Sequence, residues 1–239
     1  VFDDVYSRFM SIQDNQPHLL RDVNWLKDNV GFTGELFLGH LRYGTFGGSD
    51  VEFLHPVIRE NNWKTRNLVL AGNFNFTNVD ELFNQLVDLG QYPVATSDTI
   101  TVLERIGHFL DEENERLYAH FRKQGFEKKD ITNKIIEHID VHKVLEASAK
   151  KWDGGYAIGG LLGHGDAFIM RDPAGITPAF YYRDDEVGVA ASERPVSQTA
   201  FNVPVESVKE VKPGHALLIK HNGEVSEKLF KKSETLKAC

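Results

Sequence analysis

The feature that most constrains the fold is a change of pattern at Trp152. Before it, residues 99–126 and 131–152 form two blocks whose mixed polar and apolar residues are typical of amphipathic helices. After it, residues 154–192 are short apolar runs separated by Gly, Asp and Pro, and residues 212–230 contain two more runs around the turn sequence HNGE. This second pattern is typical of antiparallel strands. The chain is therefore expected to place a helical block before a β-rich block.

The residues ahead of these blocks predict further strands and a helix. Residues 35–45 and 67–73 are apolar and are expected to be strands, whereas residues 79–90 have apolar positions at helical spacing and end in glycine. Residues 1–31 are mostly polar and are expected to be helical in parts. Strands and helices do not alternate regularly, which argues against a parallel α/β sheet. The order strands, helices, strands predicts an α+β fold in which two sheets pack together with helices outside.

The charge balance limits the classes of partner. The chain has 239 residues and a formal net charge of −8. Nucleic acids and acidic membranes select basic surfaces, so neither is expected as a partner. No apolar stretch approaches the roughly 20 residues that cross a bilayer. The single cysteine, Cys239, excludes an internal disulfide and favours a reducing, cytoplasmic location.

Four short stretches carry a resemblance to a known family. They are GHLRYGTFG at 39–47, GNFNFTN at 72–78, SDT at 97–99, and RDPAGITPAFYY at 171–182 together with ASE at 191–193. Each alone is a weak signal. In this order and at roughly these distances, they resemble the glutaminase domain of class II glutamine amidotransferases, which are N-terminal-nucleophile (Ntn) hydrolases.

This resemblance implies a fold and an activity. Domains of this class have a four-layer αββα sandwich of two antiparallel sheets, which is the architecture expected for residues 1–239. Within the class, the motifs are most similar to those of the amidophosphoribosyltransferases, which begin purine synthesis. Such an enzyme is a transferase in which hydrolysis of glutamine supplies ammonia for reaction with phosphoribosyl diphosphate. The resemblance extends from about Glu35 to Phe230.

The resemblance also implies what lies outside the glutaminase domain. A phosphoribosyltransferase domain is expected after residue 239, with Mg²⁺ bound there, whereas the glutaminase domain needs no metal or other cofactor. L-Glutamine is expected to bind to the present domain and phosphoribosyl diphosphate to the other. The intact enzyme is expected to be a homo-oligomer.

Substrate-binding residues follow from the matched motifs. Arg42 matches the arginine that grips the glutamine α-carboxylate, a task that suits the planar fork of a guanidinium. Asp98 matches the acid that binds the α-ammonium group, and Thr45, in the same LRYGT stretch as Arg42, is expected to contribute to substrate binding. The residues alone leave other readings open: Arg42 can form a surface ion pair at a strand end, and Asp98 can cap a helix.

The resemblance places an oxyanion hole in the GNFNFTN stretch. It is formed by the side-chain NH₂ of Asn73 and the backbone N–H of Phe74. Phe74 departs from the family pattern, which has glycine there and so tolerates a positive φ. Asn75, Thr77 and Asn78 are expected to satisfy turn and cap hydrogen bonds before the next helix.

The nucleophile of the family is not found at Val1. The mechanism uses a cysteine at the mature N-terminus, and Cys239 cannot replace it because its sulfur has no free α-amine beside it. We therefore expect the chain to be an interior fragment of a bifunctional enzyme, truncated at its N-terminus and inactive as it stands. Arg171, Asp172 and Glu193 are expected to form a buried ion-pair set that braces the second sheet.

Three alternatives remain open from the sequence. The chain could come from another class II amidotransferase, such as asparagine synthetase or glucosamine-6-phosphate synthase. It could instead be a non-catalytic module that binds glutamine without hydrolysing it. A purely structural or interaction domain, which would not bind glutamine, is the third.

Overall fold

The structure is a computed structural model that describes residues 2–41, 54–93 and 97–233. Arg42 and Thr45, two of the expected substrate-binding residues, lie outside the described residues. The chain divides into two compact units, Val1–Phe37 and Leu38–Cys239. Each unit is considered by itself below.

The first unit is helical, as expected for residues 1–31. It contains α1 (Phe2–Asn15), the 3-10 helix η1 (Pro17–Arg21) and α2 (Val23–Asn29). Helix α2 begins after Asp22, whose carboxylate accepts the N–H of Trp25 at 3.0 Å. Such a cap satisfies one of the N–H groups that have no partner within the helix.

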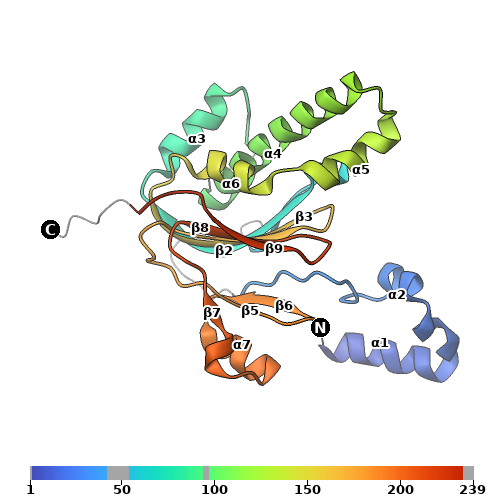
Figure 1. Cartoon of the computed structure of the whole chain (residues 1–239). Helices are drawn as coiled ribbons and strands as arrows, with labels where there is room; N and C mark the ends of the chain where they lie inside the picture. The colour runs from blue at the N-terminus through green and yellow to red at the C-terminus, as the bar shows by residue number, and fades with distance from the viewer. Residues whose placement is uncertain (1, 42–53, 94–96, 234–239) are drawn as a thin grey trace. The chain divides into compact units, whose positions relative to one another are not determined.

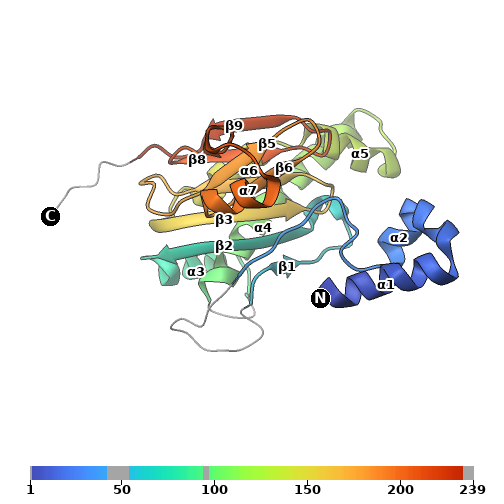
Figure 2. The same ribbon diagram turned by 90° about the horizontal axis from the view of Figure 1, so that it is seen from below.

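The second unit contains two antiparallel sheets. The larger has the strand order β1-β2-β3-β4-β8-β9, and the smaller has the order β6-β5-β7. Figure 2 shows the larger sheet from β1 at one edge to β9 at the other. The strands are β1 (Val57–Arg59), β2 (Leu68–Phe76), β3 (Gly154–Leu162), β4 (Ala167–Arg171), β5 (Phe180–Arg183), β6 (Gly188–Ala191), β7 (Lys209–Glu210), β8 (His215–Ile219) and β9 (Val225–Leu229).

Helices complete a four-layer arrangement. Four helices lie on one side of the larger sheet, the smaller sheet lies on the other side, and α7 packs on the smaller sheet (Figure 1). The predicted αββα sandwich is thereby confirmed, with a single short helix as its fourth layer. The helices are α3 (Val79–Asp88), α4 (Asp98–Lys123), α5 (Lys128–His138), α6 (Val141–Ala149) and α7 (Arg194–Phe201), with 3-10 helices η3 (Lys64–Arg66) and η4 (Val205–Ser207).

Two clusters of apolar residues hold these layers together. The larger lies between the sheet and α3 to α6, and the smaller lies between the two sheets. Fully burying one large apolar side chain contributes roughly 1.5–3 kcal/mol. The larger cluster includes Leu68, Tyr156, Met170, Leu110 and Leu145, and the smaller consists of Ala179, Val211 and Leu217 with Ala157, Ile169, Tyr181 and Val225 packed against it.

Two of the predicted elements are wrong in part. The strand expected over 35–45 is not formed by residues 35–41, and residues 42–45 lie outside the described residues. An apolar run forms a strand only where another strand pairs with it and its side chains can be buried. Residues 35–41 do not meet this condition, and Leu41 is 99% exposed. The helical block at 131–152 is broken between α5 and α6, where Ile139 is extended and Asp140 caps α6 by accepting the N–H of Lys143.

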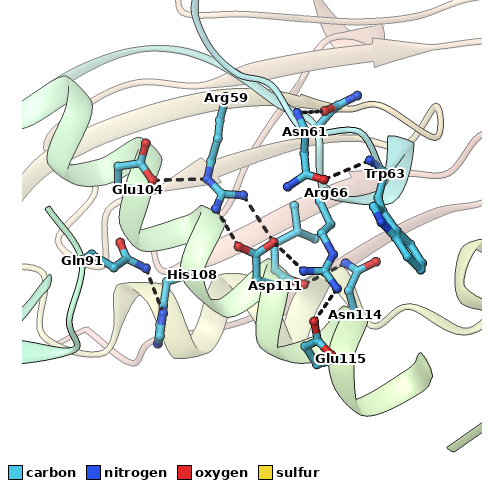
Figure 3. A network of polar contacts seen from close by, with 12 residues as sticks. Arg59, Asn61, Trp63, Arg66, Gln91, Glu104, His108, Asp111, Asn114 and Glu115 are labelled. Carbon is cyan, nitrogen blue, oxygen red and sulfur yellow. Dashed lines mark hydrogen bonds and ion pairs between the residues drawn. The ribbon is translucent and has the colours of Figure 1, made fainter. Parts of the chain in front are cut away.

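An ion-pair network joins β1 to α4 (Figure 3). The guanidinium of Arg59 donates to Asp111 at 2.6 Å and to Glu104 at 3.2 Å. Arg66 lies 3.8 Å from Asp111 and donates to Glu115 at 2.7 Å. Burial alone would lower the pKa of Arg59, but the two carboxylates outweigh it and raise the pKa. The network therefore keeps Arg59 charged and fixes β1 on one face of α4.

A second polar cluster joins two turns of the larger sheet. Asp166 precedes β4, and its carboxylate accepts both the backbone N–H and the ring Nδ1 of His221, each at 2.9 Å. Nε2 of His164 lies 3.1 Å from the other oxygen of Asp166. Burial alone would raise the pKa of Asp166, but these hydrogen bonds outweigh it and lower the pKa to about 2.

No helix among the described residues is both long enough and apolar enough to cross a membrane.

Replacing Asp111 with alanine is expected to destabilise the fold. Arg59 and Arg66 would both lose a carboxylate in a half-buried setting, which costs about 1–3 kcal/mol of the free energy of unfolding. The matched control is Glu115→Ala, because Glu115 is 66% exposed and should cost less than about 1 kcal/mol. Urea denaturation of both variants checks this, and equal losses would contradict the role of Asp111.

The lowered pKa of Asp166 predicts a pH dependence of stability. A carboxylate with a lowered pKa in the folded state contributes stability above its unfolded pKa of about 4. That contribution, about 1–2 kcal/mol, is lost as the pH falls from about 4 toward 2. The expected result is that Asp166→Asn loses less stability than the unaltered protein over this range, as measured by urea denaturation at each pH. Asp185→Asn, at an exposed position, should follow the unaltered protein.

Candidate functional site

Strand β2 presents two different faces at its C-terminal end. Phe74 and Phe76 point toward the helices, where their rings lie 5.7 Å apart and Phe76 contacts Trp152. Successive side chains of a strand point to opposite faces, so Asn73 and Asn75 lie on the other face, and both are exposed. The two asparagines are thus placed where a ligand can reach them.

The backbone N–H of Phe74 points toward the β1 edge of β2. Phe74 lies opposite Tyr156 of β3. The carbonyl of Tyr156 accepts the N–H of Asp172 and so points away from β2, which means that Phe74 and Tyr156 do not exchange hydrogen bonds. Two residues earlier, Gly72 donates its N–H to His55 on the β1 side at 3.2 Å. Because N–H directions alternate along a strand, the N–H of Phe74 shares this edge with that of Gly72. Among the described residues, no strand pairs with this edge beside Phe74.

The phenylalanine at position 74 is accommodated without backbone strain. Among the described residues, only Phe32 and Asn202 have a positive φ apart from glycines, and Phe74 is in regular strand conformation. The ring of Phe74 stacks on that of His55 at 5.5 Å with an interplanar angle of 26°. Phe74 therefore needs no positive φ to direct its N–H to this strand edge.

The polar residues at the end of β2 and immediately after it divide into two groups. Thr77 donates its hydroxyl to the carboxylate of Asp153, and Asn78 exchanges hydrogen bonds with the backbone of Lys151 and Asp153. Asn78 caps α3 without a side-chain cap hydrogen bond. The predicted turn and cap hydrogen bonds are therefore wrong for Thr77 and Asn78, whose side-chain partners belong to the segment before β3 rather than to the turn or the helix. Asn75 instead shares the exposed face with Asn73.

Asp98 is the first residue of α4. The helix cap is Ser97, whose hydroxyl accepts the N–H of Ile100 at 3.2 Å. Oδ1 of Asp98 accepts the N–H of Thr99 at 2.7 Å and lies 3.3 Å from its hydroxyl. Since Ser97 already caps the helix, the carboxylate of Asp98 is not required for that purpose. Its position in the first turn also suits a negative charge.

His55 connects these two regions. Its Nδ1 accepts the N–H of Gly72, and its Nε2 lies 3.0 Å from the hydroxyl of Thr99. The neighbours of Asn73 and of Asp98 are thus joined through one side chain. From the sequence we would read His55 as an ordinary core or surface histidine, and the one local signal is its place immediately before Pro56 and β1.

The expected ion-pair set of Arg171, Asp172 and Glu193 is wrong in its partners. Arg171 is buried and pairs with Glu210 at 2.6 Å, while Glu193 is exposed. Asp172 accepts the backbone N–H groups of Ile176 and Thr177, each at 2.9 Å. Arg171 and Asp172 thus shape the turn before β5. Glu210 is distant from Arg171 in the sequence, so the sequence does not indicate it as the ion-pair partner.

That turn borders the exposed face of β2. A methyl group placed on Gly155, which pairs with Asn75, would come within 2.9 Å of the side chain of Ile176. Glycine at this position therefore permits the close approach of the turn to the sheet. Within the described parts of the chain, no group of three or more His, Cys, Asp or Glu side chains could hold a metal ion.

Comparisons with known proteins bear on this arrangement. No family model matches the chain. The amidophosphoribosyltransferase of Pasteurella multocida (strain Pm70) is 30% identical over 244 residues, covering 96% of this chain and 43% of the relative. The amidophosphoribosyltransferase of Methanothermobacter thermautotrophicus is 28% identical over 193 residues, covering 80% of this chain and 33% of the relative. The chain thus spans less than half the length of these curated relatives.

Solved structures agree on the fold. A structure described as the allosteric regulatory enzyme of purine biosynthesis has a TM-score of 0.55 and 25% identity, over 80% of this chain and 34% of its own. A glutamine phosphoribosylpyrophosphate amidotransferase from B. subtilis, complexed with ADP and GMP, has a TM-score of 0.54 at 24% identity, over 80% and 34% of the two chains. The second likeness shows the fold alone. Together with the sequence relatives, the fold supports a class II glutamine amidotransferase domain similar to that of the amidophosphoribosyltransferases.

Proposed function

We propose that this chain is the glutamine-hydrolysing domain of an amidophosphoribosyltransferase. The ammonia released from L-glutamine reacts in a phosphoribosyltransferase domain outside residues 1–239, where 5-phosphoribosylamine forms from phosphoribosyl diphosphate with Mg²⁺ bound. The observation that carries the proposal is the placement of Asn73 and Phe74. An exposed amide side chain and an N–H directed to a strand edge that no described strand covers lie at adjacent residues of β2.

These two groups suit the oxyanion of amide hydrolysis. When a thiolate adds to the amide carbon of glutamine, negative charge develops on the amide oxygen. Donors that are already oriented stabilise this charge because they need no reorganisation during the reaction. Strand β2 is paired with β3 over residues 68–76, so the backbone that carries both donors is held rigidly. The proposal requires a nucleophilic cysteine outside residues 1–239.

The amino-acid end of the substrate requires two opposite charges. Asp98, with Oδ1 fixed by the N–H of Thr99, is the proposed partner of the α-ammonium group. Arg42 is the proposed partner of the α-carboxylate, and Thr45 is proposed to assist it. A guanidinium suits a carboxylate because it donates two parallel hydrogen bonds. Held at both charges, glutamine would keep its amide group free for the proposed oxyanion hole.

Replacing Asn73 with alanine in the full-length protein is expected to lower kcat for glutamine by about 10²–10³, with little change in KM. The amide donor acts on charge that exists only in the transition state. The matched control is Asn75→Ala, which removes an exposed asparagine from the same face two residues away. Steady-state release of glutamate measures both variants. Equal effects at the two positions would contradict the oxyanion role of Asn73.

Replacing Asp98 with asparagine is expected to weaken glutamine binding. A hydrogen bond to a charged group is worth about 1.5–3 kcal/mol, so KM should rise by roughly 10- to 150-fold. The control is Asp130→Asn, which neutralises an exposed acid in the first turn of α5. Titration of glutamine by calorimetry gives the affinity directly. An unchanged affinity in Asp98→Asn would remove this residue from the site.

A further inference from the structure

Where the pairing of β1 with β2 ends, the imidazole of His55 replaces a backbone group as the hydrogen-bond partner of β2. The β1–β2 register pairs Val57 with Leu70, so its continuation sets His55 opposite Gly72. Pro56 lies between and has no N–H to continue the ladder. Nδ1 of His55 accepts the N–H of Gly72 instead, at 3.2 Å. The ring therefore holds β2 at the residue immediately before Asn73.

The contacts of His55 define its tautomer. A backbone N–H can only donate, so Nδ1 must accept and cannot carry a proton. The proton of a neutral ring is then on Nε2, which donates to the hydroxyl oxygen of Thr99 at 3.0 Å. The hydroxyl proton of Thr99 remains available for Oδ1 of Asp98 at 3.3 Å. Three hydrogen bonds thus run in one direction, from the strand of Asn73 to the carboxylate of Asp98.

This chain of hydrogen bonds also orients Asp98. Both contacts from Thr99, through its N–H and its hydroxyl, end on the same oxygen, Oδ1. Among the described residues, none donates a hydrogen bond to Oδ2, which leaves that oxygen for the cationic end of the proposed substrate. Thr99 is only 7% exposed, so water competes little for its hydroxyl.

Aromatic packing holds the ring of His55 in this orientation. One contact is the stack on Phe74 at 5.5 Å, and the other is with the ring of His40, 4.7 Å away with an interplanar angle of 50°. Because the ring is held by this packing and by its hydrogen bonds to Gly72 and Thr99, it can transmit a displacement from one region to the other.

We propose that His55 is a positioning residue that couples the strand of the oxyanion hole to the carboxylate that binds the substrate ammonium, acting as the neutral imidazole with its proton on Nε2. This inference rests on the proposed function, because it assigns His55 to the same glutamine site. His55 touches neither the reacting amide nor the nucleophile. It sets the geometry of the residues that do.

The two contacts can be removed one at a time. Asparagine at position 55 places an amide oxygen near the position of Nδ1, so His55→Asn can keep the bond from Gly72 and loses the contact with Thr99. Glutamine is longer and reaches the position of Nε2, so His55→Gln can keep Thr99 and loses Gly72. The two variants therefore test the two ends of the connection separately.

The expected result is a crossover in steady-state kinetics of the full-length protein. His55→Asn should raise KM for glutamine about tenfold and leave kcat within about threefold. His55→Gln should lower kcat about tenfold and leave KM within about threefold. The control is His108→Gln. His108 is a half-buried histidine on α4 that contacts Gln91 (Figure 3), and its replacement should change neither kcat nor KM.

The outcomes separate this inference from the proposed function. If the unaltered protein does not hydrolyse glutamine, the proposed function is refuted. If it does, folded variants with unaltered kcat and KM, or with the same parameter changed in both, overturn the role of His55. The tautomer is tested independently by a two-bond ¹H–¹⁵N NMR spectrum. A proton found on Nδ1 at neutral pH would overturn the assignment whether or not the protein is active.

Discussion

The ion pair between Arg59 and Asp111 is the contact on which the geometry of the candidate site depends. It ties β1 to the middle of α4, with Glu104 as a second partner about two turns away along the helix. His55 precedes β1 by two residues, and Asp98 begins α4. The position of one relative to the other therefore follows from how β1 lies along the helix. The network is only half-buried, so its charges keep partial solvation while their geometry is fixed.

Helix α4 leaves room for this contact at one residue. A methyl group on Gly107 would come within 2.5 Å of the side chain of Arg59. Glycine lowers the intrinsic stability of a helix interior by about 1 kcal/mol. Here it lets the arginine cross the helix surface and reach both carboxylates. The long helix therefore accepts a locally unfavourable residue where a tertiary contact requires the space.

The sequence predicts the elements that depend on local pattern and misses those that depend on distant partners. Helix α3 and the strands after Trp152 follow from periodicity and turn residues. The three-residue strand β1 has no such signal, because it is defined by pairing with β2. The partner of Arg171 is likewise set by the fold, which brings Glu210 beside it rather than Glu193.

The candidate site shows the same division in sharper form. Asn73, Phe74 and Asp98 can be singled out from the sequence, because each lies in a stretch that resembles a family motif. His55 has no such mark, and only the three-dimensional contacts reveal that it joins the other residues.

Phe74 illustrates why residue types alone do not settle the geometry. The family pattern has glycine at this position, so phenylalanine suggests a distorted backbone, because a residue with a side chain disfavours a positive φ. In the fold it occupies an ordinary strand position, and its ring supports the imidazole of His55. A glycine here would offer the same N–H but no surface for that ring. In the proposed site the phenylalanine and the histidine therefore act as a pair: Phe74 would supply a donor for the oxyanion, and His55, held by the ring of Phe74, would fix the strand that carries this donor.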